Sequence, residues 1–302
     1  MKTEVDQAYV SRLTDAAQRK SFDPWRDIDW SVPFDDSYFY LPQDLVSLYG
    51  TELWNSMTRE QQVRLSLHEA SSTFAQGLWF ENILGFKLLD YLYQANPQEA
   101  HFYWMLQEVA DECRHQMMFG EFIRRSGTPW YYPEWWATYV ANFTRYVAPK
   151  VSVFLGVLAA EATTDYLNRR VMQDPECHPI MRQIARIHVI EEARHLGYAR
   201  HWLEENYAEM SLPMRVLVRA QAPIVTMTLL SQLVSSRVYD EVGLPPHAVS
   251  VARRNPAQRR FWQDACAELI EFLDGIGAVN WRIAPVWRVL GMMESAGELD
   301  AS

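Results

Sequence analysis

The sequence predicts an all-α protein, and three observations support that class. From Thr58 onward, apolar residues return at three- and four-residue steps, and Gly and Pro gather between the periodic segments. No stretch alternates apolar and polar residues for long enough to be a strand. The 12 Trp, 15 Tyr and 13 Phe against only 12 Gly are typical of long, well-packed elements and not of a turn-rich β fold.

Breakers and capping signals place the expected helices. The first 57 residues carry Pro24, Pro33 and Pro42, and we expect an irregular arm with one short helix near residues 9–20. Thr58 with Gln61 three residues later is typical of a capping-box start. Long helices are then expected at about 58–94, 98–125, 150–173 and 180–206, with a shorter one at 134–146 and two or three more in 207–302.

Composition excludes several classes of function. The formal net charge of −10, without a dense Lys/Arg cluster, argues against nucleic acid as a partner. The three cysteines, Cys113, Cys177 and Cys266, are too scattered for a disulfide framework, which favours a reducing cytoplasm. The N-terminus has no apolar signal region. The apolar stretch Val216–Val234 is interrupted by Arg219, so we expect a buried helix and no membrane span.

One internal repeat carries the chemistry. Residues 111–115 read Asp-Glu-Cys-Arg-His and residues 191–195 read Glu-Glu-Ala-Arg-His, so each contains Glu-x-x-His on one helix face. The two motifs are 80 residues apart (192 − 112), and Glu81 and Glu161 are also 80 apart (161 − 81). Each lone glutamate therefore stands 31 residues before its Glu-x-x-His (112 − 81 and 192 − 161).

The turns fall at the midpoints of these intervals, at Asn96-Pro97 and between Pro175 and Pro179. In an antiparallel hairpin, each lone Glu and its Glu-x-x-His then sit at matching heights, about 15 residues or roughly 23 Å from the bend. Two packed hairpins bring together the ligand set of a carboxylate-bridged di-iron or di-manganese site. Its six candidate ligands are Glu81, Glu112, His115, Glu161, Glu192 and His195.

A lone Glu-x-x-His usually lies on a solvated helix surface, and that alternative has to be weighed. Glu81 stands in the run Gly-Leu-Trp-Phe-Glu-Asn-Ile-Leu-Gly-Phe, and Glu161 follows Phe-Leu-Gly-Val-Leu-Ala-Ala. Carboxylates on apolar faces are costly unless they are paired or bound to metal. Four such groups in two matched hairpins favour the metal site.

His188, four residues before Glu192, extends the stripe to a possible seventh ligand. The order Glu81, Glu112-x-x-His115, Glu161, His188-x-x-x-Glu192-x-x-His195 resembles the p-aminobenzoate N-oxygenase family of di-iron enzymes. The additional histidine distinguishes that family, and the resemblance covers about residues 60–206. It implies a ferritin-like helical bundle of two antiparallel hairpins with extra N- and C-terminal helices. In one domain, residues 1–57 would form the arm, 58–206 the metal-bearing helices and 207–302 packing helices.

Other residues near the motifs receive subsidiary roles. Asp111 and Glu191 would each accept the Nδ1–H of a ligand histidine from the other hairpin. Arg114 and Arg194 would hold these acids, with an ordinary surface ion pair as the alternative. Asp165 is a further outer acid, whereas Glu108 could be a solvated side chain. Residues one turn from the ligands could line a substrate pocket or be plain core: Gly77, Leu78, Phe119, Val157 and Leu158.

The resemblance implies oxidation of an amine nitrogen to hydroxylamine, nitroso or nitro products. Two irons, with manganese or a mixed Mn/Fe pair as alternatives, would activate dioxygen as co-substrate. Electrons would come from an external reductase or reductant, because the chain has no flavin or nicotinamide fingerprint. A homodimer is a family-level expectation. The rival functions are C–H hydroxylation or desaturation at the same site, and iron storage. An aromatic cluster at Trp130–Trp136 could cap the channel or lie at a subunit contact.

Overall fold

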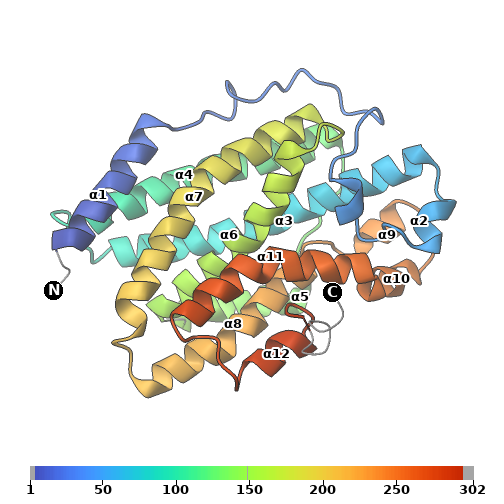
Figure 1. The fold of residues 1–302 in the computed structure, drawn as a ribbon. Coiled ribbons are helices and arrows are strands. Elements are labelled where there is room, and N and C mark those ends of the chain that lie inside the picture. The colour runs from blue at the N-terminus through green and yellow to red at the C-terminus, as the bar shows by residue number, and fades with distance from the viewer. Residues whose placement is uncertain (1–3, 148, 295–302) are drawn as a thin grey trace.

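The computed structural model describes residues 4–147 and 149–294, and within them it holds helices and no strand (Figure 1). An isolated parallel bridge joins Phe39 to Cys177. The helices in chain order are α1 (Glu4–Arg19), the 3-10 turn η1 (Gln43–Leu45), α2 (Glu52–Ser56), α3 (Arg59–Leu92), α4 (Ala100–Ser126), α5 (Trp135–Val147), α6 (Lys150–Gln173), α7 (Pro179–Tyr207), α8 (Leu212–Gln232), α9 (Arg237–Glu241), α10 (Ala248–Arg254), α11 (Pro256–Gly275) and α12 (Ala284–Val289). The all-α prediction is confirmed.

Four long helices form the two expected hairpins, because α3 packs along α4 and α6 packs along α7. The start of α3 is fixed by reciprocal capping bonds between Thr58 and Gln61. The first hairpin ends at Gly127, whose φ of 67° is left-handed and favours a residue without a side chain. In the second hairpin, Pro179 occupies the first turn of α7, where no helical hydrogen bond is lost.

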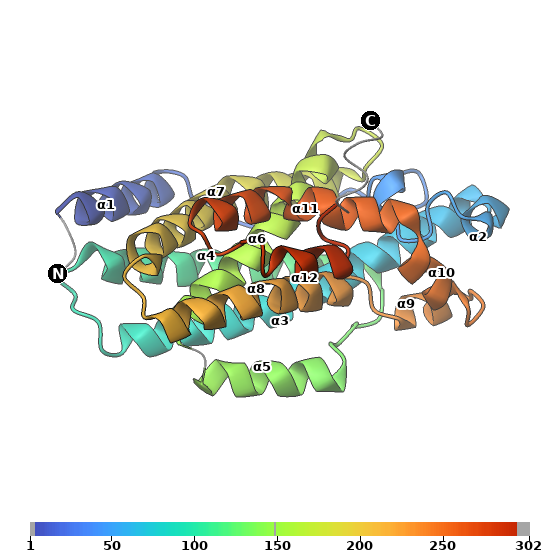
Figure 2. The same cartoon turned by 60° about the horizontal axis from the view of Figure 1, so that its bottom comes forward.

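The other helices cover the two hairpins. Helix α1 lies across α4 and α7 and begins at Glu4, earlier than the short helix expected near residues 9–20. Helices α8 and α11 both pack against α6. In Figure 2, α5 lies alongside α3 at the edge of the molecule. The hairpins are therefore enclosed on several sides, which leaves their shared interface dry.

Two apolar clusters form the core, and the predicted ligands lie between them on all four long helices. On α3, Phe74 belongs to one cluster and Leu84 to the other, and Glu81 stands between them. On α4, Met118 and Met105 bracket the Glu112 motif in the same way. The polar site is therefore a layer inside the hydrophobic core, where unpaired charge is costly.

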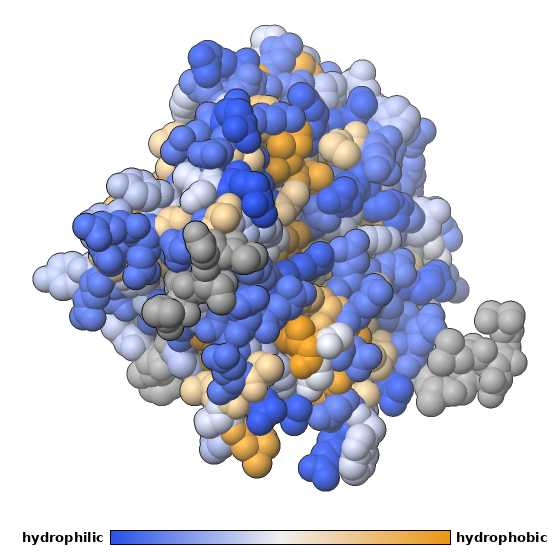
Figure 3. Space-filling model, turned by 60° about the vertical axis from the view of Figure 1, so that its left-hand side comes forward, coloured by the Kyte–Doolittle hydropathy of each residue, from blue (hydrophilic) through white to orange (hydrophobic). Residues whose placement is uncertain are grey.

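Helix α8 was predicted to be buried, but part of it is exposed. It packs on α6 through residues such as Val218 and Leu230, but Val216 and Ile224 are 53% and 61% exposed. The prediction was wrong because hydropathy reports apolar character and not the presence of a packing partner. By length and composition alone, the segment that begins at Leu212 is the one described helix that could cross a membrane, which is a weak indication by itself. The face in Figure 3 is mostly hydrophilic with small hydrophobic patches.

Candidate metal centre

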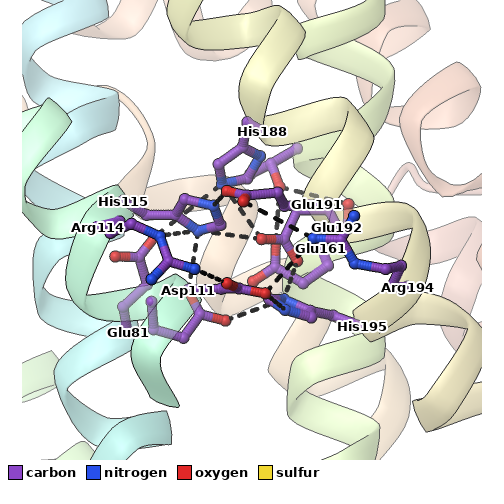
Figure 4. A network of polar contacts seen from close by, with 12 residues as sticks. Glu81, Asp111, Arg114, His115, Glu161, His188, Glu191, Glu192, Arg194 and His195 are labelled. Carbon is purple, nitrogen blue, oxygen red and sulfur yellow. Dashed lines mark hydrogen bonds and ion pairs between the residues drawn. The ribbon is translucent and has the colours of Figure 1, made fainter. Parts of the chain in front are cut away.

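The structure brings all seven predicted ligand side chains into one cluster at the interface of the two hairpins (Figure 4). Each of them is at most 5% exposed, so the cluster is shielded from water. Helix α3 contributes one side chain, α4 two, α6 one and α7 three. They are Glu81, Glu112, His115, Glu161, His188, Glu192 and His195.

Glu112 and Glu192 lie at the centre, and each carboxylate faces the histidines of both repeats. Oε2 of Glu112 is 3.1 Å from Nδ1 of His115, and its Oε1 is 3.2 Å from Nδ1 of His195. Glu192 mirrors this arrangement, with Oε1 3.2 Å from Nδ1 of His115 and Oε2 2.9 Å from Nδ1 of His195. The repeat in the sequence thus reappears as a two-fold arrangement of two glutamates and two histidines.

His188 joins the cluster on the side of His115, with 4.8 Å between the two ring centroids. Its Nε2 lies 3.8 Å from Oε1 of Glu192 and 4.0 Å from Oε1 of Glu81. Its Nδ1 lies 2.9 Å from the amide of Asn168. His188 therefore faces the site with Nε2, whereas His115 and His195 face it with Nδ1.

The outer acids contact histidines from the opposite hairpin, as the sequence indicated. Oε2 of Glu191 on α7 lies 2.9 Å from Nε2 of His115 on α4, and Oδ2 of Asp111 on α4 lies 3.4 Å from Nε2 of His195 on α7. The predicted nitrogen was wrong. Nδ1 of each ring faces the glutamate one turn back on its own helix, which leaves Nε2 to contact the acid.

The arginines hold these outer acids in place. Arg114 pairs with Asp111 on its own helix, and an Arg194 guanidinium nitrogen lies 3.5 Å from Asp111 and 3.7 Å from Glu191. Arg194 therefore connects the outer acids of both hairpins. The pairs are buried at the acid and largely covered at the arginine, unlike an ordinary surface ion pair.

Two carboxylates differ from their sequence interpretation. Asp165 pairs with Arg169 on its own helix at 2.5 Å and makes no recorded hydrogen bond to the site histidines among the described residues. Glu108 is 1% exposed and has an oxygen within 4.8 Å of ligand atoms of Glu112 and His195, so its interpretation as a solvated side chain was wrong. Glu108 stands at the position of the first repeat that is equivalent to His188 (188 − 108 = 80), and this equivalence was the signal for a buried position beside the ligands.

Comparison with known proteins identifies the chain's relatives. The family described as P-aminobenzoate N-oxygenase AurF matches residues 3–277, which run from the N-terminus through α11. The chain belongs to the p-aminobenzoate N-oxygenase family. An uncharacterized protein of Mycobacterium bovis and one of Mycobacterium tuberculosis are each 27% identical to it over 299 residues, covering 93% of this chain and 85% of the relative. Membership of this family implies that the chain is an oxygenase, and the buried Glu and His groups described above could hold a metal.

The electrostatics of this N-oxygenase family member show a site that requires positive charge. Burial, together with the charge of Glu112, raises the pKa of Glu81 well above its usual range, and burial with the charge of Glu192 does the same for Glu161. Burial lowers the pKa of the imidazoles, but the surrounding carboxylates overcome it and raise the pKa of His115 and His195. The carboxylates therefore favour positive charge at this point of the core.

A cavity of about 70 Å³ adjoins the His188 side of the cluster. Of the residues predicted to line a pocket, Gly77 and Phe119 do so, and a Cβ on Gly77 would lie 2.9 Å from a ring carbon of Phe119. Leu78 instead lines a neighbouring cavity. Val157 and Leu158 are at most 1% exposed in the core, because their faces of α6 turn away from the cavity. The lining that the sequence missed comes partly from the end of α8 and the residue that follows it: Leu229, Gln232 and Leu233.

The aromatic cluster that follows α4 lies outside this cavity. Trp130 and Tyr132 are 62% and 48% exposed and line the neighbouring cavity, whereas Tyr131 is fully buried. Trp79 lines both cavities and stands between them. A role of the cluster at a subunit contact stays a prediction.

Proposed function

We propose that the chain is a di-iron N-oxygenase that uses dioxygen to oxidise the nitrogen of a small-molecule amine. The observation that carries the proposal is the arrangement of Glu112 and Glu192, each of which faces both repeat histidines through its two oxygens. Membership of the N-oxygenase family supports the reaction type. An external reductant, a homodimer and a cytoplasmic location remain predictions of the same proposal.

The donor set fits two cations. Among the described residues, Glu81 keeps a buried carboxylate oxygen without a hydrogen-bond partner, and Oε1 of Glu112 and of Glu192 has only an ion-pair contact of 3.2 Å with a histidine Nδ1. Such atoms are costly in a dry core unless a cation binds them. Carboxylate oxygens mixed with imidazole nitrogens suit iron or manganese better than copper or a structural zinc. Glu81, Glu112, His115, Glu161, His188, Glu192 and His195 would hold the metal ions.

The bound metals would supply the activation of dioxygen and the transfer of oxygen to nitrogen. The chain's own residues prepare the site for that chemistry. Glu191 and Asp111 accept the Nε2–H of His115 and His195, which keeps each Nδ1 free for a metal. The amide nitrogen Nδ2 of Asn168 lies 2.9 Å from Nδ1 of His188. For Nε2 of His188 to bind a metal, Nδ1 would carry the proton, and the Asn168 amide would have to turn so that its oxygen accepts that proton.

The cavity positions the substrate beside His188, Glu81 and Glu161, which all form part of its wall. The rest of the wall is mostly apolar, and Phe74 and Phe119 stack there with their ring centroids 4.6 Å apart. These rings exclude water and fit an aromatic or other apolar body, whose amine would point at the metals. A cavity of this kind favours an enzyme over an iron-storage protein, because storage needs no organic substrate.

Metal analysis and single-turnover chemistry test the proposal together. Protein from iron-supplied cells should contain close to two irons per chain. After anaerobic reduction and exposure to dioxygen, it should convert an aryl or alkyl amine into a product with a new N–O bond. A hydroxylated or desaturated carbon product without a new N–O bond would favour the C–H rival. Less than one iron per chain would contradict the metal assignment itself.

A further inference from the structure

A chain of aromatic and imidazole side chains leaves the metal cluster on the side away from the cavity. The Trp104 ring lies 5.9 Å from the ring of His195, and the Tyr198 ring lies 5.4 Å from Trp104, measured between centroids. Both side chains are fully buried, and neither lines the substrate cavity. Indole and phenol are the most easily oxidised aromatic side chains, so this order places two one-electron donors in series next to a metal ligand.

Tyr198 also has a proton acceptor in place. Its hydroxyl lies 2.8 Å from Nδ1 of His101, and Nε2 of His101 lies 2.9 Å from Oδ2 of Asp6. With Asp6 ionised, Nε2 of His101 carries the proton and Nδ1 can accept the phenol proton. Burial raises the pKa of Tyr198 well above its usual value, so the phenol keeps its proton at rest. The loss of an electron from Tyr198 therefore has to be coupled to movement of this proton.

The outer end of the chain approaches the protein surface. The other oxygen of Asp6 lies 2.8 Å from Nε2 of His201, whose side chain is 19% exposed. The ring of Tyr9 packs against His201 at 4.5 Å between centroids. The path thus runs from His195 in the core to the surface where α1 covers α4 and α7 (Figure 1).

We propose that Trp104 and Tyr198 form a one-electron relay that reduces the oxidised metal centre when no amine occupies the cavity. The His101–Asp6 pair accepts the phenol proton. The inference rests on the proposed di-iron function. One electron passes from Tyr198 through Trp104 to the centre, and the phenol proton passes to Nδ1 of His101. The products are a neutral tyrosyl radical and an imidazolium paired with Asp6. The external one-electron reductant then restores the electron, and His101 returns the proton.

A purely structural role is the alternative, because the Tyr198–His101–Asp6 hydrogen bonds also fasten α1 to the bundle. The two roles differ in what they predict for Trp104→Phe. This variant leaves the hydrogen bonds of Tyr198 in place and removes only the indole between Tyr198 and His195. A structural role predicts no change in radical formation, whereas the relay predicts its loss.

The test is freeze-quenched electron paramagnetic resonance of reduced, iron-loaded protein mixed with dioxygen in the absence of amine. The wild type should form a tyrosyl radical, recognised by the narrowing of its signal when ring-deuterated tyrosine is incorporated. Tyr198→Phe and Trp104→Phe should each lower the radical yield at least fivefold. The matched control is Tyr40→Phe, since Tyr40 is also fully buried and packs against a histidine, His178, but is remote from the site.

The control variant should keep the wild-type radical yield. Equal yields in the wild type and Tyr198→Phe would overturn the relay, as would wild-type protein that forms no radical while it still converts an added amine into an N-oxygenated product. The second result leaves the proposed function intact. If the wild type binds no iron and consumes no dioxygen, the proposed function fails first, so the two failures are distinguishable.

A second readout follows damage to the protein. During repeated reduction and oxygenation without amine, Tyr198→Phe and Trp104→Phe should accumulate oxidised residues around the metal site several-fold faster than the wild type, as measured by mass spectrometry of peptides. Equal rates of damage in all variants would contradict the discharge role.

Discussion

Glu191 offers a direct test of how the chain prepares its histidines for metal. Oε2 of Glu191 lies 2.9 Å from Nε2 of His115, and both side chains are 0% exposed. Glu191→Gln keeps the size of the side chain but removes its charge. The bond from His115 then loses its charge assistance, which makes such bonds about twice as strong as neutral ones. Nδ1 of His115 then becomes a weaker electron-pair donor to a bound cation.

The expected loss follows from this geometry. Removal of an outer hydrogen-bond partner of a ligand histidine typically weakens metal binding about 10- to 100-fold, or roughly 1.4–2.7 kcal/mol. We expect the upper half of that range, because the charge that is lost is fully buried and no water can compensate for it. Arg194 also loses an anionic neighbour 3.7 Å away, which places an uncompensated charge next to the site.

The assay is anaerobic competition between the protein and a chelator for Fe(II) or Mn(II). The matched control is Glu69→Gln, since Glu69 is also a 0% exposed carboxylate on α3 but accepts hydrogen bonds from Ser47 outside the metal cluster. Its metal affinity should stay within twofold of the wild type. An affinity of Glu191→Gln within twofold of the wild type would refute this account of how His115 is held.

Three further outcomes are expected. Burial raises the pKa of Glu69 to about 7, above its value in the unfolded chain. The folded protein therefore has its full stability below about pH 4.5 and loses roughly 3 kcal/mol of it as the pH rises through 7. Chemical denaturation from pH 4.5 to 8 should show a flatter dependence of the unfolding free energy on pH for Glu69→Gln than for the wild type. Asn168→Leu removes the amide that contacts Nδ1 of His188 and should weaken metal binding about tenfold by chelator competition, whereas Asn168→Asp, whose carboxylate can accept an Nδ1–H, should retain binding. No described residue lining the cavity is Lys or Arg, so calorimetry should find p-aminobenzoate binding at least about tenfold more weakly than its uncharged methyl ester. An unchanged pH profile for Glu69→Gln, an unchanged metal affinity for Asn168→Leu, or equal affinities for p-aminobenzoate and its methyl ester would contradict the respective expectation.

The sequence predicted the helices and the central cluster well for a physical reason. Helical periodicity and the spacing of Glu81, Glu112, Glu161 and Glu192 are both local properties, and hairpin geometry converts equal spacing into equal height. The seven side chains accordingly meet in the structure.

What the sequence could not predict depends on distant packing. The cavity wall includes Leu229 and Gln232 from α8, and nothing in the local pattern indicates that α8 lies there. The rotation of α6 decides that Val157 enters the core while Ala160 lines the cavity. Glu108 illustrates a different limit, since one glutamate on a helix looks like surface unless its counterpart in the repeat is considered.

The exchange of His188 for Glu108 between the two repeats makes the two ends of the cluster chemically unlike. The end near His115 has an additional imidazole, whereas the end near His195 has an additional carboxyl group that can become anionic. His188 also lines the cavity, and Glu108 does not. The repeated ligands are therefore symmetric, but the charge beside them differs between the side that faces the cavity and the side that faces the protein interior.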